Sequence, residues 1–287
     1  MSTSADFQMG LSAAQSGDFA TALREWTPLA ILGNAAAQFN LGVMYDKGQG
    51  VPQNDKTALN WYGLAAKQGH AKSQYNLGVM YTQGRGVPQN HKTALKWFRL
   101  AAKQGNAAAQ FNLGVMYNEG KGVPQKYKTA AKWYRLAAEQ GDAIAQTNLG
   151  DMHKNGKGVP QSHKTAVKWY RLAAKQGNAG AQTSLGVMYA QGQGVPESDK
   201  TALKWFRLAA EQGNANAQYS LGLMYGTGQG VIQDWVYAHM WGNLGASNGS
   251  ESGGELRDLA AKEMTPAEIS KAQDLASECA RKKYTGC

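Results

Sequence analysis

The chain has 287 residues, and its 30 Lys and Arg residues against 20 Asp and Glu residues give a formal net charge of +10. No apolar run approaches the ~20 residues that a membrane-spanning helix needs, so we expect no membrane span. Its two cysteines are too few for a disulfide scaffold, and the positive charge indicates a surface field without identifying a partner.

The start of the chain, residues 1–6, lacks the basic and apolar regions of a secretory signal. We therefore expect either a cytoplasmic protein or a periplasmic or secreted one whose leader was removed. Cys279 and Cys287 both lie in the tail. The residues themselves leave two states open for this pair, namely free thiols or one disulfide that ties the tail to the final helix.

Residues 1–33 are predicted to form a degenerate capping repeat, because Glu25 stands where the later units have a tryptophan. Six tryptophans and six Leu-Gly pairs then keep a fixed 36-residue spacing, which predicts a repeat array in which each unit contacts its neighbours. The tryptophans are Trp61, Trp97, Trp133, Trp169, Trp205 and Trp241. The predicted units are 34–69, 70–105, 106–141, 142–177, 178–213 and 214–249.

Each unit is predicted to contain two helices, as the unit 106–141 illustrates. A first helix over 107–118 places its apolar residues on one face. Residues 119–124 break it, because glycine accepts positive φ and proline excludes a continued helix. A second helix covers 127–140, and we expect Trp133 to be buried between helices. The glycine of each Leu-Gly pair is expected to let a neighbouring helix approach closely.

Residues 250–287 are predicted to form a helical C-terminal cap. A stretch rich in serine and glycine, 247–254, leads to a helix around 255–263. Thr265 then has the properties of a helix cap, with proline at the first helical position.

The recurring run Ala-x-Ala-Gln-x-x-Leu-Gly-x-Met-Tyr, then Gly-x-Gly-Val-Pro-Gln, then Ala-x-x-Trp-x-x-x-Ala-Ala-x-x-Gly resembles the Sel1-like repeat (SLR) family, a relative of the tetratricopeptide repeat. It stands at 107–141 and recurs in the other units. The resemblance implies an all-α fold, an α-solenoid built as a right-handed superhelix of antiparallel helix pairs. It also implies a non-enzymatic scaffold or adaptor for another protein or a peptide, in bacteria often in the envelope or in contact with a host.

Members of this family with cysteine pairs in every repeat bind or cleave β-lactams, so an envelope enzyme such as a β-lactam-binding hydrolase is one alternative. No repeat here carries a cysteine, and no Ser-His-Asp set, phosphate loop, zinc spacing or nucleophile elbow is present. We therefore expect no enzyme activity, no cofactor and no bound metal. The closing Cys279-x7-Cys287 pattern is similar to the tail of exported bacterial relatives.

In the related tetratricopeptide fold, the first helix of each pair lines the inner, concave wall. The resemblance therefore places a candidate groove on the face of that helix opposite the core. Its apolar and aromatic ladder would hold a peptide, with asparagine side chains bonding the peptide backbone. The alternative is that these residues serve only for ordinary packing between adjacent repeats. The predicted groove residues are Phe39, Asn40, Val43, Lys72, Tyr75, Asn76, Val79, Phe111, Asn112, Val115, Asn148, Asp151 and Tyr219.

The unit 142–177 departs from this ladder. Thr147, Asp151 and His153 stand where the three preceding units have an aromatic ring, a valine and a tyrosine. One hypothesis is a polar contact point within the groove. The favoured alternative is drift in a redundant array, or a local Asp–His pair.

A basic stripe follows the second helix of four units, which makes an anion-binding module on the convex face a further alternative. We interpret the stripe as the solvated face of amphipathic helices. Glu139 and Glu211 interrupt it, and no aromatic residue interleaves with it, which argues against nucleic acid as a partner. The residues of this basic band are Lys92, Lys96, Arg99, Lys128, Lys132, Arg135, Lys164, Lys168, Arg171, Lys204 and Arg207.

Overall fold

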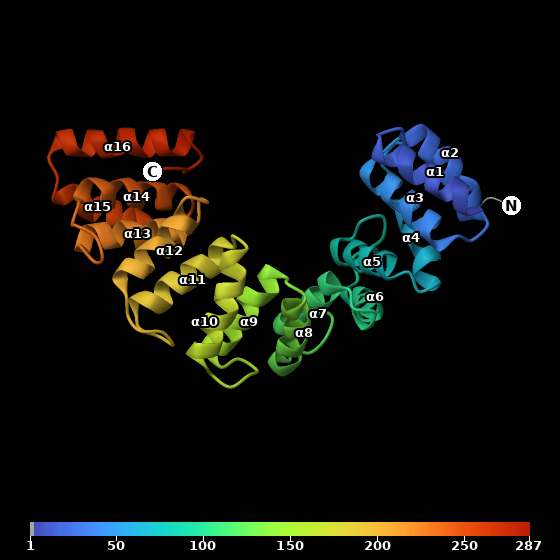
Figure 1. Ribbon diagram of the computed structural model, residues 1–287, viewed down its shortest axis with the longest axis horizontal. Helices are drawn as coiled ribbons and strands as arrows, with labels where there is room; N and C mark the ends of the chain where they lie inside the picture. Colours follow the sequence, from blue (N-terminus) through green and yellow to red (C-terminus); the bar gives the residue numbers. More distant parts are fainter. Residues whose placement is uncertain (1–2) are drawn as a thin grey trace. The chain divides into compact units, whose positions relative to one another are not determined.

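The structure, a computed structural model, describes residues 3–287, and every regular element in that range is an α-helix (Figure 1). The helices form two compact units, one ending at Gln140 and the other beginning at Gly141. The first unit holds α1 (Thr3–Gln15), α2 (Phe19–Ile31), α3 (Ala35–Lys47), α4 (Asp55–Lys67), α5 (Ala71–Gln83), α6 (His91–Lys103), α7 (Ala107–Glu119) and α8 (Tyr127–Glu139). The second holds α9 (Ala143–Asn155), α10 (His163–Lys175), α11 (Ala179–Ala190), α12 (Asp199–Ala210), α13 (Ala215–Thr227), α14 (Trp235–Ser247), α15 (Glu251–Lys262) and α16 (Pro266–Arg281).

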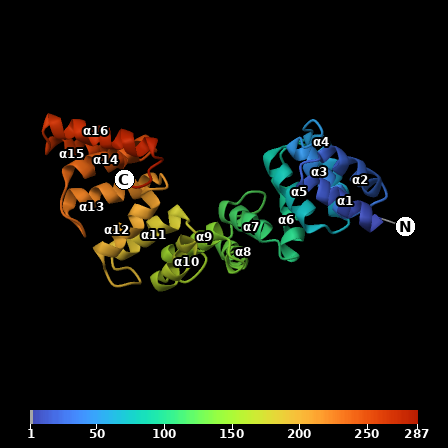
Figure 2. The same ribbon diagram turned by 45° about the horizontal axis from the view of Figure 1, so that its top comes forward.

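Within each unit, the helices pack as consecutive pairs, and the second helix of one pair also packs against the first helix of the next. Figure 2 shows this succession for α1 to α4 from a second direction. We call the first helix of each pair helix A and the second helix B. The fold is all-α, as predicted, and it is built as a solenoid of helix pairs. No helix within residues 3–287 combines the length and apolar character that crossing a membrane requires.

In five of the six Leu-Gly pairs, the glycine has no room for a side chain because an aromatic ring occupies that space. A Cβ added to Gly114 on α7 would lie 2.4 Å from the Tyr134 ring of α8. Gly78 meets the Phe98 ring in the same way, at 2.5 Å. The predicted close approach at this glycine is therefore made by a buried ring of the same pair. These rings are Tyr62, Phe98, Tyr134, Tyr170 and Phe206.

The prediction that Trp133 is buried between helices is wrong, because this indole is only half-buried. One residue corresponds to about 100° of helix rotation, so it is the next residue, Tyr134, that points into the pair and is buried. Trp133 instead packs one side against the core of α6 and α7. Trp241 is the exception among the periodic tryptophans, since it is buried and is followed by Gly242 rather than by a ring.

Within each unit, a buried glutamine joins one helix pair to the next. The Gln74 side chain donates from Nε2 to the Ala66 carbonyl oxygen at 3.1 Å, and its Oε1 accepts from Gln104 Nε2 at 2.8 Å. Both polar ends of a side chain that is 4% exposed are therefore satisfied, as buried amides require. The same side-chain pair recurs as Gln38–Gln68, Gln110–Gln140, Gln146–Gln176 and Gln182–Gln212, and as Gln218–Asn248 in the last repeat.

The C-terminal cap differs from its prediction at one point. Helix α15 begins at Glu251, so part of the serine- and glycine-rich stretch is helical. The reason is close packing, because a Cβ on Gly253 would lie 2.8 Å from the Ala246 nitrogen and 2.9 Å from the Gly242 oxygen. The predicted cap at Thr265 is confirmed, and its side chain forms a capping box with Glu268.

We expect Gly114→Ala to lower the free energy of unfolding by about 1–3 kcal/mol, because the new methyl group has to displace the buried Tyr134 ring. The matched control is Gly63→Ala in α4, where a Cβ would meet no atom within 4 Å. That change should raise stability by about 0.5–1 kcal/mol through helix propensity. Urea unfolding of both variants, followed by tryptophan fluorescence, measures the difference. Equal stabilities would mean that the ring contact does not exclude a side chain at residue 114.

Candidate functional site

The structure places most of the predicted groove residues in the first unit, on helices α3, α5 and α7. They occupy the same positions on each helix and so form three rows. We call these rows the α3–α5–α7 ladder. The ring row is Phe39, Tyr75 and Phe111; the asparagine row is Asn40, Asn76 and Asn112; and the valine row is Val43, Val79 and Val115. All of these residues are half-buried, and Lys72 is exposed beside them.

Each ring of the ladder rests on the buried ring of its own helix pair. The centroids are 6.0 Å apart for Phe39 and Tyr62, 5.9 Å for Tyr75 and Phe98, and 5.9 Å for Phe111 and Tyr134. These separations lie in the range of favourable aromatic contacts. The buried rings therefore hold the ladder rings in place while part of each ladder ring stays exposed.

Ordinary packing accounts for part of the ladder. Phe39 and Val43 pack against the core of α4 and α5, and Tyr75 and Val79 pack against the core of α6 and α7. Packing between repeats and peptide binding, the two interpretations of these residues, therefore concern different sides of the same side chains. One side joins neighbouring repeats, and the other faces solvent.

The asparagine row is oriented by bonds within the repeat. Asn112 Nδ2 donates to the Ala108 carbonyl at 2.8 Å. Asn76 is hydrogen-bonded to the Tyr62 hydroxyl, which also lies 3.2 Å from an Asp46 carboxylate oxygen. Burial raises the pKa of Tyr62 well above its usual value, and the Asp46 charge raises it further. Tyr62 is thus a neutral hydrogen-bonding group beneath the ladder at physiological pH.

A hollow of about 240 Å³ opens at the N-terminal end of the ladder. Asn40 and Val43 line it from α3, and Leu11, Phe19 and Trp26 line it from the α1–α2 pair. Its walls are mostly apolar, and the amides of Gln15, Asn40 and Gln49 complete the lining. Such a space is suited to an apolar side chain whose backbone stays near the asparagine.

The second unit does not continue the aromatic row in its first repeats. The hydroxyls of Thr147 and Thr183 donate to carbonyls of their own helices. Asp151 accepts a hydrogen bond from the Tyr170 hydroxyl at 2.6 Å, and burial followed by this bond raises the pKa of Tyr170. His153 Nδ1 lies 3.3 Å from the Pro160 carbonyl oxygen. Asp151 therefore acts within its own helix pair, where Tyr62 and Asp46 have the corresponding contact in the first unit.

Tyr219 and Asn148, the other groove residues predicted in the second unit, are half-buried on α13 and α9. Tyr219 has an aromatic side chain at the position of the ring row. The two preceding repeats of this unit have Thr147 and Thr183 at that position. The uninterrupted aromatic row therefore lies in the first unit.

The residues of the basic band are exposed on α6, α8, α10 and α12. Three of its arginines also bond to a tyrosine of the following helix A. Arg171 donates to the Tyr189 hydroxyl at 2.7 Å, and its guanidinium carbon lies 5.9 Å from the centre of that ring. The other two bonds are Arg99 to Tyr117 and Arg207 to Tyr225. In each case the arginine and the tyrosine are 18 residues apart in the sequence. This recurring spacing is a sequence pattern from which the bonds could have been predicted.

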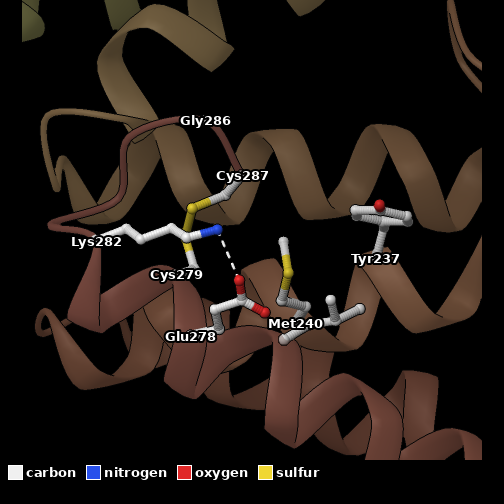
Figure 3. Close-up of a pocket in the computed structure, with 8 residues that line it drawn as sticks. Tyr237, Met240, Glu278, Cys279, Lys282, Gly286 and Cys287 are labelled. Carbon is white, nitrogen blue, oxygen red and sulfur yellow. Dashed lines mark ion pairs between the residues drawn. A yellow bond between two sulfur atoms is a disulfide. The ribbon is translucent and has the colours of Figure 1, made fainter.

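A smaller hollow, of about 140 Å³, lies beside the C-terminal disulfide (Figure 3). Cys279 and Cys287 are bonded to each other, which decides between the two states that the sequence left open. Glu278 and Lys282 form an ion pair of 2.6 Å on the wall of this hollow. Within residues 3–287, no three His, Cys, Asp or Glu side chains are grouped as a metal site would need.

Comparison with known proteins identifies the family. The Sel1 repeat family model matches residues 35–70, 71–106, 107–142, 143–178, 179–214 and 215–250. A Sel1 repeat protein from Oxalobacter formigenes has a similar structure, with 35% sequence identity and a TM-score of 0.75 over 84% of this chain and 96% of that one. No curated protein matches the chain.

A second solved structure is c5321, described as a protective antigen in uropathogenic Escherichia coli strains that displays an SLR fold. It is 26% identical, with a TM-score of 0.56, over 98% of this chain and 85% of that one. The chain therefore belongs to the Sel1 repeat family. Members of this family are generally protein-interaction scaffolds and are typically not enzymes.

We expect His70 to make the stability of the first unit sensitive to mild acid. Its neutral Nδ1 caps α5 by accepting from the Ser73 backbone N–H at 3.3 Å, and its ring lies 4.8 Å from that of Phe39. Burial, and then the Lys72 charge, lower the pKa of His70 below its usual value. The contribution of this cap is therefore present above about pH 6.5 and is lost as the pH falls through the lower folded-state pKa.

The variant His70→Asn restores the asparagine cap found before α3 and α7, and asparagine accepts this bond at any pH. Its advantage over the parent chain should grow by up to about 1 kcal/mol between pH 7.5 and pH 5. Urea unfolding at both pH values measures it. Identical pH dependence in the two proteins would show that His70 does not act as a titrating cap.

Proposed function

We propose that this Sel1 repeat protein is a non-enzymatic scaffold whose α3–α5–α7 ladder holds an extended or helical segment of a partner protein. The proposal rests on the row of Phe39, Tyr75 and Phe111, in which each ring is half-exposed and braced from below by a buried ring. Aromatic side chains that are already fixed lose little conformational freedom on binding, so their contact area contributes efficiently to affinity.

The surroundings of the rings support a peptide as the ligand. Asn112 is oriented by a bond from its amide nitrogen to its own helix, and no hydrogen bond of its amide oxygen is found among residues 3–287. An asparagine row spaced along an apolar row suits a chain that offers backbone N–H and C=O groups between apolar side chains. The hollow beside Asn40 and Val43 would take one such side chain.

The basic band is less suited to be the main site. Arg99, Arg171 and Arg207 already bond to tyrosines of their own chain, and the exposed lysines around them carry a large solvation shell. An anionic partner on this band would depend on exposed charges and would be strongly weakened by salt. Binding to the apolar ladder, by contrast, should depend little on the salt concentration.

Peptides selected from a displayed random library on the whole chain test the proposal. We expect their affinity to fall tenfold or more in the double variant Tyr75→Ala/Phe111→Ala, because the apolar contact area is lost. Titration calorimetry at low and moderate salt measures the affinity, which should change little with salt. The matched control, Lys92→Glu/Lys96→Glu, reverses two exposed band charges and should leave the affinity within about twofold, since charges distant from an apolar site contribute little.

A milder variant separates binding from folding. Asn112→Ala removes one amide of the ladder without touching a ring and should weaken the same peptides several-fold through the lost hydrogen bond. Thermal unfolding of each variant shows whether the chain is folded at the titration temperature. Peptides that bind the ladder variants normally, or that respond only to the band variant and to salt, would overturn the proposal.

A further inference from the structure

The helix B face of the first unit contains a hollow of about 370 Å³ between α4, α5 and α6. Gly63 and Leu64 of α4 line it, together with Tyr81 of α5 and Trp97 of α6. It is separate from the ladder, whose rows lie on helices A. Unlike the Leu-Gly glycines, Gly63 is not required by close packing, because a Cβ there would meet no atom within 4 Å. A helix-interior glycine costs about 1 kcal/mol relative to alanine, and nothing in the packing requires this one.

The other repeats show what normally fills this place. Residues 36, 72, 108 and 144 positions after Gly63 are Arg99, Arg135, Arg171 and Arg207. Arg171 crosses to the next helix A, where its guanidinium group bonds to the Tyr189 hydroxyl and lies over the Tyr189 ring. Trp205 follows on the next helix B and packs against the same core. Tyr81 and Trp97 hold the corresponding positions around Gly63, so this hollow lies where the repeat of Arg171 has its arginine side chain.

The groups around the hollow match a guanidinium ion chemically. No hydrogen bond of the Tyr81 hydroxyl is found within residues 3–287, which leaves its oxygen available as an acceptor. The faces of Tyr81 and Trp97 attract a planar cation through the ring quadrupole, and Leu64 offers an apolar wall for an alkyl stem.

The local charge is also more favourable here than elsewhere on the basic band. Asn60 stands where the next four repeats have Lys96, Lys132, Lys168 and Lys204, and Gly63 removes the arginine charge. Two of the cations of the band are therefore missing around this hollow. Lys67 remains on its wall as an exposed charge. The wall of this hollow therefore carries one lysine. The next four repeats have a further lysine and an arginine around the equivalent place.

We propose that the hollow beside Gly63 binds the guanidinium group of an arginine side chain presented by a partner protein. The bound arginine takes the place of the side chain that the next four repeats supply themselves. It donates to the Tyr81 hydroxyl and stacks on the aromatic faces of Tyr81 and Trp97. This site lies outside the proposed peptide ladder, and it does not depend on that ladder being a binding surface.

Titration of the whole chain with N-acetyl-arginine amide, followed by ¹⁵N nuclear magnetic resonance, tests the proposal. We expect saturable shifts of the Gly63 amide and the Trp97 indole N–H, in the millimolar range expected for one side chain. N-acetyl-citrulline amide has nearly the same shape without the charge and should bind at least tenfold more weakly. Equal responses to both compounds, or no response near Gly63, would overturn the proposal.

Two variants probe the same site in opposite directions. Gly63→Arg fills the hollow from within and should abolish the shifts at Trp97 while leaving the chain at least as stable. Arg171→Ala empties the equivalent place in the second unit and should create a new response of the Trp205 indole to the arginine probe. Shifts at Trp97 that persist in Gly63→Arg, or an Arg171→Ala chain that gains no response at Trp205, would contradict the role assigned to the missing arginine.

Discussion

The contact between the Leu-Gly glycine of helix A and the buried ring of helix B is the constraint on which the other features of the repeat depend. With a ring atom 2.4–2.5 Å from where a Cβ would be, helix A has no room for any side chain at that residue. The contact sets the distance between the two helices and their register. Once the pair is set, the ladder rings have a surface to rest on, and the adjacent tryptophan is turned toward the preceding repeat.

Contacts between pairs then follow at fixed sequence separations. The buried glutamine of helix A bonds to a carbonyl eight positions earlier in the preceding pair, as Gln74 does to Ala66, and the arginine–tyrosine bonds join residues 18 positions apart. Each contact reaches only the neighbouring pair, so the stability of the array is a sum of local terms. A surface position in one repeat is therefore free to change without affecting repeats farther along. That freedom explains how Asp151 replaces a valine and simply bonds to Tyr170 below it.

The sequence was sufficient to predict the repeats, the helix breaks and the fold class, because glycine, proline and cap residues act locally and recur six times. It was not sufficient to decide which of two adjacent aromatic residues is buried. Trp133 and Tyr134 are separated by 100° on a helix whose apolar face is wide enough for both, and only the position of Gly114 on the partner helix selects Tyr134. The early start of α15 was hidden for a similar reason. Gly253 resembles a loop residue in sequence, and its function is a close crossing with Gly242.

Two departures from the repeat show how the same physical rule leads to different outcomes. In the last repeat Gly242 stands where the other repeats have the buried ring, and Leu256 of α15 comes within 2.9 Å of the Cβ position of Gly222 in its place. The space is closed by the cap itself, which agrees with Leu256 being only 4% exposed. In the first repeat Gly63 stands where the next four repeats have arginine, and no side chain of the described chain takes over its volume. A residue lost at the end of the array is replaced from within, whereas a residue lost on the outer face leaves an opening. Since a glycine there lowers helix stability without a packing benefit, an external side chain that fills the opening would recover contacts that the neighbouring repeats already make internally.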